Sequence, residues 1–227
     1  MKTVIYKSIR LILGLFLFAL GIVMTINANI GLQPWDIFHQ GLSKVIHMTM
    51  GQTSILVGLV IVIFNIFMKE KARWGTLGNM VLIGLFMDFL MLNNLIPEAN
   101  HFVVGILMML AGLFVIGIAS YFYIGTGWGT GPRDGLMVVF IKKTGKSVRF
   151  VRNTIEITAS VAGYFLGGSI GIGTVITATT IGYFVQFAFK LFNFNVEEVQ
   201  HRYIDDDLRF LYKKIKTHKK KEKELME

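Results

Sequence analysis

Long apolar runs, separated by short polar breaks, make up most of this chain. Six of these runs approach or exceed the roughly 20 residues that a bilayer-spanning helix needs, so they predict six membrane-spanning helices. The predicted spans are residues 11–30, 48–68, 77–95, 102–124, 148–166 and 172–192. Two further apolar pieces, 36–46 and 134–141, are shorter. About 11 helical residues at ~1.5 Å each cover roughly half of a ~30 Å hydrocarbon core, so neither piece can cross it.

The two short pieces follow breaks of similar sequence. Gly-Leu-Gln-Pro-Trp-Asp at 31–36 is matched by Gly-Thr-Gly-Pro-Arg-Asp at 129–134, a spacing of 98 residues. The same spacing relates 14–16 to 112–114, 75–76 to 173–174, and Gly84 to Gly182. A period this long indicates a duplicated half rather than a stacked array. We therefore divide the chain into a first membrane repeat (1–98), a second membrane repeat (99–192) and a tail (193–227).

The distribution of basic residues predicts how the two repeats are oriented. Cytoplasmic loops are enriched in Lys and Arg. The segment 31–53 has no net charge, whereas its counterpart 129–152 has a net charge of +5. The N-terminus, the 69–73 loop and the tail are also basic, and the 97–100 and 167–171 turns hold no Lys or Arg. We expect an all-α polytopic fold of two inverted three-helix repeats, each with a short broken or re-entrant helix, and both termini in the cytoplasm.

Composition supports this class and excludes several others. The chain is 53% hydrophobic and 16% charged, with a mean hydropathy of +0.59, which is too apolar for an ordinary soluble domain. Its first apolar segment recurs deep in the second repeat, so we expect a retained helix rather than a cleaved signal peptide. The net charge of +9 comes from loops and tail, which argues against nucleic-acid binding. With no cysteine, thiolate catalysis and disulfides are excluded.

Enzyme motifs are missing as well. Gly145-Lys146-Ser147 resembles the end of a phosphate-binding loop, but the upstream glycine that the motif requires is Phe140. We expect no enzymatic activity, no cofactor and no metal ion. In the tail, Ile204, Leu208 and Leu211 recur at helical spacing among lysines. This pattern fits an amphipathic helix on the anionic inner leaflet or a solvated charged tail, and the sequence does not separate the two.

The two Pro-x-Asp breaks carry the main candidate chemistry. Proline suits the first position of a helix, and an aspartate two places later is favoured by the helix dipole. One interpretation is that both breaks are good helix starts and nothing more. The other is that two half-helices bring their N-termini together inside the membrane, to bind an anionic or carbonyl group there or a proton, cation or ammonium group at the aspartates. The substrate-binding candidates are Gln33, Asp36, His39, Gly131, Arg133 and Asp134.

A second group of polar residues lies within the predicted spans. Glu156 shares a helical face with Arg149 and Arg152, either as their neutralising partner or as part of a gate or proton relay. Asp88 corresponds to Gln186 in the second repeat, and two polar residues at one internal position favour a place in a cavity wall. The coupling candidates are therefore Asp88, Arg152, Glu156 and Gln186. The three tryptophans flank the breaks and are expected to be interfacial anchors.

These motifs resemble the YczE/YyaS/YitT-like family of bacterial integral membrane proteins. The residues that carry the resemblance are Pro34-Trp35-Asp36, His39 to Leu42, Gly127 to Met137, Val151-Arg152 with Glu156, and Gly171 to Thr174. The resemblance covers about residues 11–186 and leaves out the tail. It implies a multi-pass protein of the bacterial inner or plasma membrane. The family has no settled activity, so no binding residue is carried over from it.

Taken as a whole, the sequence predicts a small transporter for a solute or ion, with its site where the two breaks meet. Paired breaks in inverted repeats are a recurring plan among secondary transporters. The alternative is a non-transporting accessory or regulatory membrane protein that acts on a partner through its basic tail. We expect the lipid bilayer as its surroundings. The sequence leaves open a homo-oligomer, the substrate and the coupling ion.

Overall fold

The computed structural model describes residues 2–71 and 73–195, and this part of the chain is all-α. Its eight helices are α1 (Lys2–Asn27), α2 (Pro34–Ile46), α3 (Met50–Phe67), α4 (Trp74–Leu92), α5 (Phe102–Ile124), α6 (Pro132–Thr144), α7 (Val148–Phe165) and α8 (Ile172–Leu191). The predicted amphipathic tail falls on residues beyond 195 and so lies outside the described residues.

Local chemistry explains where several helices begin and end. α3 starts with a capping box, in which the Thr49 hydroxyl accepts from the Gln52 amide and the Gln52 side chain accepts from the Thr49 amide. α1 ends at Asn27, three residues before the predicted end, and Asn29 then adopts a left-handed φ of 54°. α2 and α6 begin at Pro34 and Pro132, two residues before the predicted starts, because proline is preorganised for the first helical turn.

Five of the described helices are long and apolar enough to cross a membrane: α1, α3, α4, α5 and α8. They correspond to five of the six predicted spans. α7 is not among them, although its 18 residues match α3 in length. It carries Arg149, Arg152 and Glu156, which lower its hydropathy. By composition the structure therefore supports five spans and not six.

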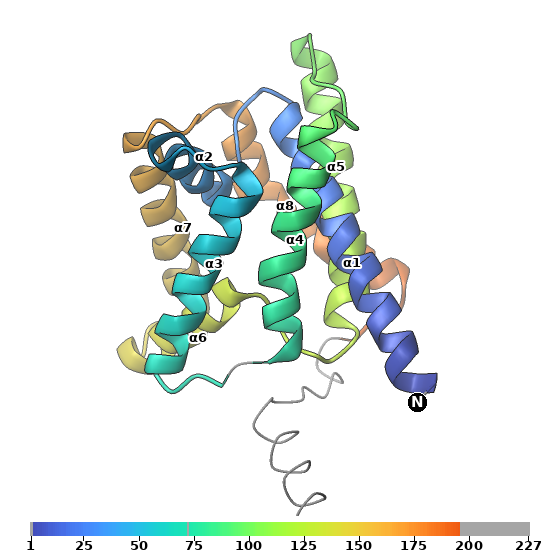
Figure 1. Cartoon of the computed structure of the whole chain (residues 1–227), viewed down its shortest axis with the longest axis vertical. Helices are drawn as coiled ribbons and strands as arrows, with labels where there is room; N and C mark the ends of the chain where they lie inside the picture. The colour runs from blue at the N-terminus through green and yellow to red at the C-terminus, as the bar shows by residue number, and fades with distance from the viewer. Residues whose placement is uncertain (1, 72, 196–227) are drawn as a thin grey trace, which may run out of the picture.

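The core of the bundle lies between α1, α4 and α5. Leu15, Met109 and Leu113 are completely buried there, and Met87 of α4 packs with them. α1 and α5 run in opposite directions side by side along the bundle (Figure 1). They approach closely where Gly21 and Gly112 face each other, since a Cβ on either glycine would lie within 2.8 Å of the other's carbonyl oxygen. Small residues permit such packing between membrane helices.

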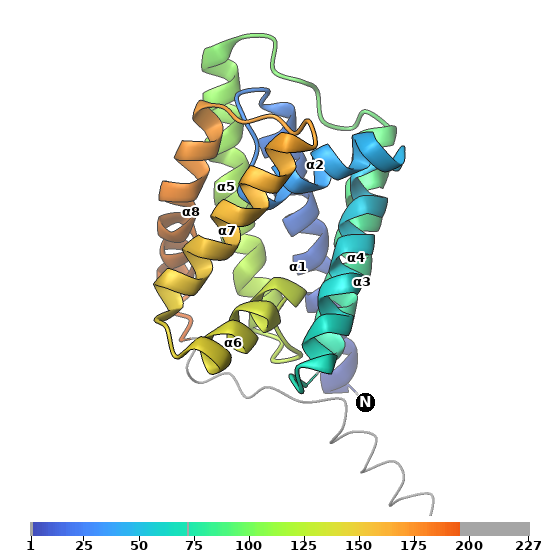
Figure 2. The same ribbon diagram turned by 90° about the vertical axis from the view of Figure 1, so that its left-hand side faces the viewer.

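The two short helices lie across opposite ends of the bundle. α2 is at the end remote from the N-terminus, and α6 is at the same end as the N-terminus (Figures 1 and 2). α2 packs on α7, and α6 packs on α3. Lys44 near the end of α2 donates to the Gly167 carbonyl at 2.7 Å, and Lys142 near the end of α6 pairs with Glu70 at 2.6 Å. Each short helix is thus held by the other half of the chain.

The helix bounds repeat at the spacing found in the sequence. Adding 98 to the bounds of α2 gives those of α6, and adding 98 to the bounds of α3 gives those of α7. α1 and α4 correspond in the same way to α5 and α8, apart from differences at the helix ends. The duplicated motifs therefore mark equivalent helices along the chain.

Asp88 joins α4 to the start of α3. Its carboxylate accepts hydrogen bonds from the Thr49 hydroxyl at 2.5 Å and from the Gly51 amide at 2.9 Å. A carboxylate at a helix N-terminus satisfies amides that have no partner within the helix and is favoured by the dipole. This aspartate thus has a structural role that its position in an apolar span did not reveal.

We predict that Asp88→Ala destabilises the protein by about 1–3 kcal/mol, because two hydrogen bonds at a charged, partly buried cap are lost. The measurement is thermal unfolding of the purified protein in detergent. Gln186→Ala, at the equivalent and exposed position of α8, is the matched control and should leave the midpoint nearly unchanged. Equal shifts for the two variants would contradict the capping role.

Candidate functional site

A cavity of about 470 Å³ lies in the interior of the bundle, and all eight described helices contribute to its wall. The first turns of both short helices reach it: Pro34 to Asp36 from α2 and Pro132 to Asp134 from α6. Apolar side chains such as Phe18, Ile83 and Ile116 complete the wall. The volume is typical of pockets for small molecules, which are mostly apolar with a few convergent polar groups.

Asp36, His39 and Arg133 form a chain of charged and polar groups between the two short helices. Arg133 Nη2 lies 3.4 Å from His39 Nε2, and His39 Nδ1 lies 3.6 Å from Asp36 Oδ1. A guanidinium only donates, so Nε2 must accept and the ring proton belongs on Nδ1, toward the carboxylate. Asp36 and His39 are 3% and 1% exposed. Nδ1 has no hydrogen-bond partner among the described residues, and a small shift would complete the bond to Asp36.

The indole ring of Trp35 also contacts Arg133. The guanidinium carbon lies 4.7 Å from the centroid of the indole ring, and the ring also borders the cavity. A cation over an aromatic face is attracted by the ring quadrupole. The sequence assigned Trp35 to interfacial anchoring, so its place in the site was missed. Its position between Pro34 and Asp36 in the break was the available signal.

The other charged groups of the cavity are partly satisfied by local partners. Asp134 accepts from the Gly131 amide at 3.1 Å, so it stabilises the start of α6 as well as facing the cavity. Arg152 Nε donates to Glu156 Oε1 at 3.0 Å, one turn apart on α7. The cavity therefore presents carboxylates and guanidinium groups together, an arrangement suited to a polar or ionic group of a ligand.

The cavity brings together most of the residues selected from the sequence. Those that line it are Gln33, Asp36, His39, Gly131, Arg133, Asp134, Arg152, Glu156 and Gln186. Asp88 does not line it, because its carboxylate is turned to the start of α3. Within the described residues, no group of three His, Asp or Glu side chains is placed to hold a metal ion.

Five further polar residues in the cavity wall were not selected from the sequence: Ser54, Asn79, Ser120, Tyr123 and Thr177. Tyr123 is 3% exposed, and its hydroxyl has no hydrogen-bond partner in the described part of the chain. A buried hydroxyl without a partner is costly, so it is a natural contact for a bound polar group or water. Their polar side chains within apolar spans were the available signal.

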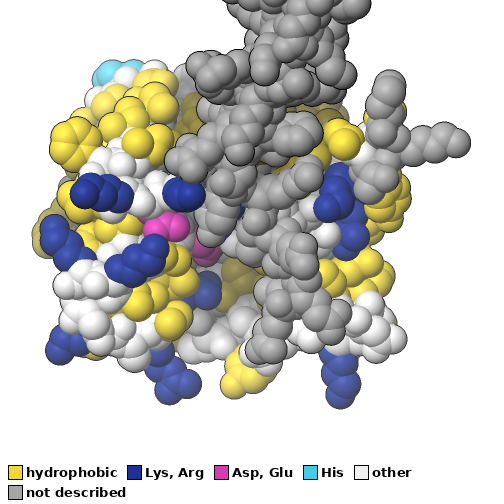
Figure 3. Space-filling model, turned by 90° about the horizontal axis from the view of Figure 1, so that it is seen from below, with side chains coloured by type: hydrophobic (Ala, Val, Ile, Leu, Met, Phe, Trp, Pro, Cys, Tyr) yellow, Lys and Arg dark blue, Asp and Glu magenta, His cyan; other side chains and the backbone are white. Residues whose placement is uncertain are grey.

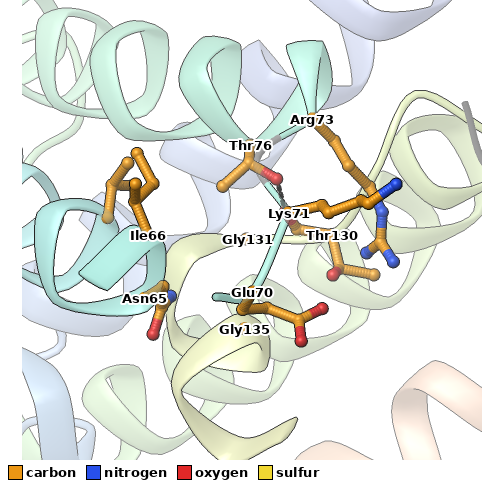
Figure 4. A pocket seen from close by; sticks show the side chains of 10 residues that line it. Asn65, Ile66, Glu70, Lys71, Arg73, Thr76, Thr130, Gly131 and Gly135 are labelled. Carbon is orange, nitrogen blue, oxygen red and sulfur yellow. Dashed lines mark hydrogen bonds between the residues drawn. The ribbon is translucent and has the colours of Figure 1, made fainter. Parts of the chain in front are cut away.

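A second, much smaller hollow lies beside the start of α6. Asn65, Glu70, Arg73, Thr76 and Thr130 surround it, and the Thr76 hydroxyl donates to the Thr130 carbonyl at 2.6 Å (Figure 4). Its volume of about 20 Å³ suits a single water molecule rather than a solute. The large cavity is the better candidate for a binding site.

We predict that Arg133→Gln lowers stability by about 0.5–2 kcal/mol, because the contact with the Trp35 ring is lost. It should also change the tryptophan fluorescence. Arg152→Gln is the control, since its side chain is 59% exposed and has Glu156 as its ion-pair partner. Thermal unfolding and emission spectra in detergent provide both readouts. If both variants behave alike, Arg133 does not join the two short helices.

Comparison with known proteins places the chain among uncharacterised membrane proteins. It is 39% identical over 177 residues to the uncharacterised membrane protein YczE of Bacillus subtilis, covering 77% of this chain and 81% of that protein. An uncharacterised protein of Haemophilus influenzae is 30% identical over 183 residues (80% and 83%), and YyaS of B. subtilis is 26% identical over 175 residues (73% and 83%). No solved structure matches. Residues 5–190 match the model of a family of unknown function, DUF6198, and this multi-pass membrane protein belongs to that family.

Proposed function

We propose that the protein is a transporter of a small solute or ion, built from two inverted repeats with one central site. The observation that carries the proposal is the meeting of the first turns of α2 and α6 in a cavity of about 470 Å³. Midplane sites formed by broken helices from two repeats recur among secondary transporters. Free amides at helix N-termini and buried carboxylates are the groups that bind ions there.

The course of the helices supports inverted repeats. In Figure 1, α1 and α4 run upward and α3 downward, whereas α5 and α8 run downward and α7 upward. Each of these helices therefore runs in the opposite direction to the helix that lies 98 residues later in the chain. In this proposal α7 is the sixth span, because it has the length of α3 and packs against α2 as α3 packs against α6. Its charged residues border the cavity instead of facing lipid alone.

The distribution of charge supports a cytoplasmic position for the end that carries the N-terminus. Seen from this end, lysine and arginine side chains stand around much of the visible face (Figure 3). The described basic residues near it include Lys7, Arg10, Lys69, Lys71, Arg73, Lys142, Lys143, Lys146, Arg149 and Lys190. At the other end, the described loops and α2 contribute one lysine, Lys44, and no arginine, together with Asp36 and Glu98. By the positive-inside rule the basic end faces the cytoplasm.

Cysteine labelling tests this architecture, because the native chain contains no cysteine. Ser43→Cys and Lys143→Cys place single thiols on α2 and α6, near opposite ends of the bundle. With a membrane-impermeant thiol reagent on intact cells, Ser43→Cys should react and Lys143→Cys should react only after permeabilisation. If both thiols react from the same side, the repeats are not inverted and the proposed central site loses its basis.

Ligand-dependent thermal stabilisation tests the site itself. We expect that a screen of ions, amines, carboxylates and amphiphiles in detergent finds a compound that raises the unfolding temperature. Asp36→Asn and Asp134→Asn should each abolish that stabilisation while keeping a folded protein, because the carboxylates border the cavity. Glu98→Gln, exposed and outside the cavity, is the matched control. Stabilisation that survives both aspartate substitutions would place the ligand elsewhere.

A further inference from the structure

One helix interface is closed in the first half of the chain. α3 packs along α4, and Gly51 and Gly84 are so close that a Cβ on Gly84 would lie 2.6 Å from the Gly51 carbonyl oxygen. Asp88 then bonds to Thr49 and Gly51 at the end of this contact. These short contacts close the interface between α3 and α4 at the end that carries Gly51 and Asp88.

The equivalent interface of the second half lacks each of these features. At the positions 98 residues later, Arg149 replaces Gly51 and Gln186 replaces Asp88. Arg149 is too large for the close approach. Gly182, the counterpart of Gly84, has open space beside it, because a Cβ there would meet no atom within 4 Å. α7 and α8 make no contact comparable to that between α3 and α4.

This open seam between α7 and α8 is continuous with the central cavity. Arg152 and Glu156 of α7, and Ala178, Gly182 and Gln186 of α8, belong to the cavity wall. All three α8 residues are exposed. On the outer surfaces of the same helices, Ile157 and Tyr183 are 63% and 74% exposed, as expected for side chains that face lipid.

The polar residues of the seam lie toward the basic end of the bundle. Arg152 and Glu156 are four and eight residues from the start of α7, which corresponds to about 6–12 Å along a helix. Gln186 is five residues before the end of α8. Apolar side chains, among them Ile83, Ile116 and Ile181, line the interior beyond them. A molecule in the seam would therefore meet charge near the membrane surface and hydrocarbon inside.

We propose that the seam between α7 and α8 is a lateral entrance to the cavity, and that the solute is an amphiphile from the adjacent leaflet. Its polar head would lie among Arg152, Glu156 and Arg133, and its apolar part would fill the cavity. A molecule of this kind is already concentrated in the bilayer, whereas a hydrated ion would lose its hydration on this route. This inference rests on the proposed function and names its class of solute.

The test uses Trp35 as a reporter inside the cavity. Trp74→Phe and Trp128→Phe leave Trp35 as the single tryptophan. The protein is reconstituted into phosphatidylcholine vesicles with brominated or unbrominated acyl chains, because bromine quenches tryptophan on contact. We expect the brominated lipid to quench Trp35. Gly182→Phe, whose ring enters the open space beside α8, should abolish the quenching, as should Ala178→Phe.

Val175→Phe is the matched control, since Val175 lies on the same helix, is 64% exposed and does not border the cavity. It should leave the quenching unchanged. Absent quenching in the parent, or quenching that persists in both blocked variants with normal gel-filtration profiles, would overturn the lateral entrance. The proposed function is judged separately, from the labelling of Ser43→Cys and Lys143→Cys and from ligand stabilisation in detergent, neither of which requires this route.

Discussion

The organisation of this protein depends on two helices that are too short to cross a bilayer. The backbone amide and carbonyl groups at their ends need hydrogen-bond partners. Unpaired amide and carbonyl groups are tolerated at membrane depth only where protein or a water-filled cavity surrounds them. α2 and α6, with 13 residues each, reach only about 20 Å. Their first turns therefore have to lie inside the bundle, and the other helices are arranged around them. Proline at the first position of each helix reduces the problem, because it has no amide to satisfy.

The two halves satisfy this requirement for each other. α2 is covered by α7 from the second half, and α6 by α3 from the first. Asn65 of α3 donates to the Pro132 carbonyl at 3.0 Å, which secures the start of α6. Arg133, from the start of α6, in turn meets His39 and Trp35 of α2. Neither half can bury its short helix alone, so the cavity exists only when both halves are packed together.

Corresponding helices in the two halves nevertheless pack differently. Gly51 and Asp88 close the contact between α3 and α4, whereas Arg149 and Gln186 stand at the matching places near α7 and α8. Helices whose bounds recur at a spacing of 98 residues thus differ in a few side chains that decide whether two of them pack closely. The charged residues of α7 follow from the same division, since they border a polar cavity and need not face lipid on every side.

The sequence by itself determined the helices, their approximate bounds and the spacing of 98 residues at which the helix bounds recur. These features depend on local chemistry: apolar runs of spanning length, proline and glycine at the breaks, and a motif repeated at a spacing of 98. Most of the residues that it selected also line the cavity, because charged and polar groups are rare in apolar spans. Only the tertiary structure decided their partners. Asp88 lies in an apolar span and reads from the sequence as part of a cavity wall, but it caps α3 instead. Trp35 reads as an interfacial anchor, but it lies against Arg133, the residue at the equivalent position of the second break, and the contact between their side chains depends on how the two breaks are packed. The opening between α7 and α8 that we propose as an entrance could not be predicted from the sequence either, because it depends on how closely the backbones of these two helices approach each other.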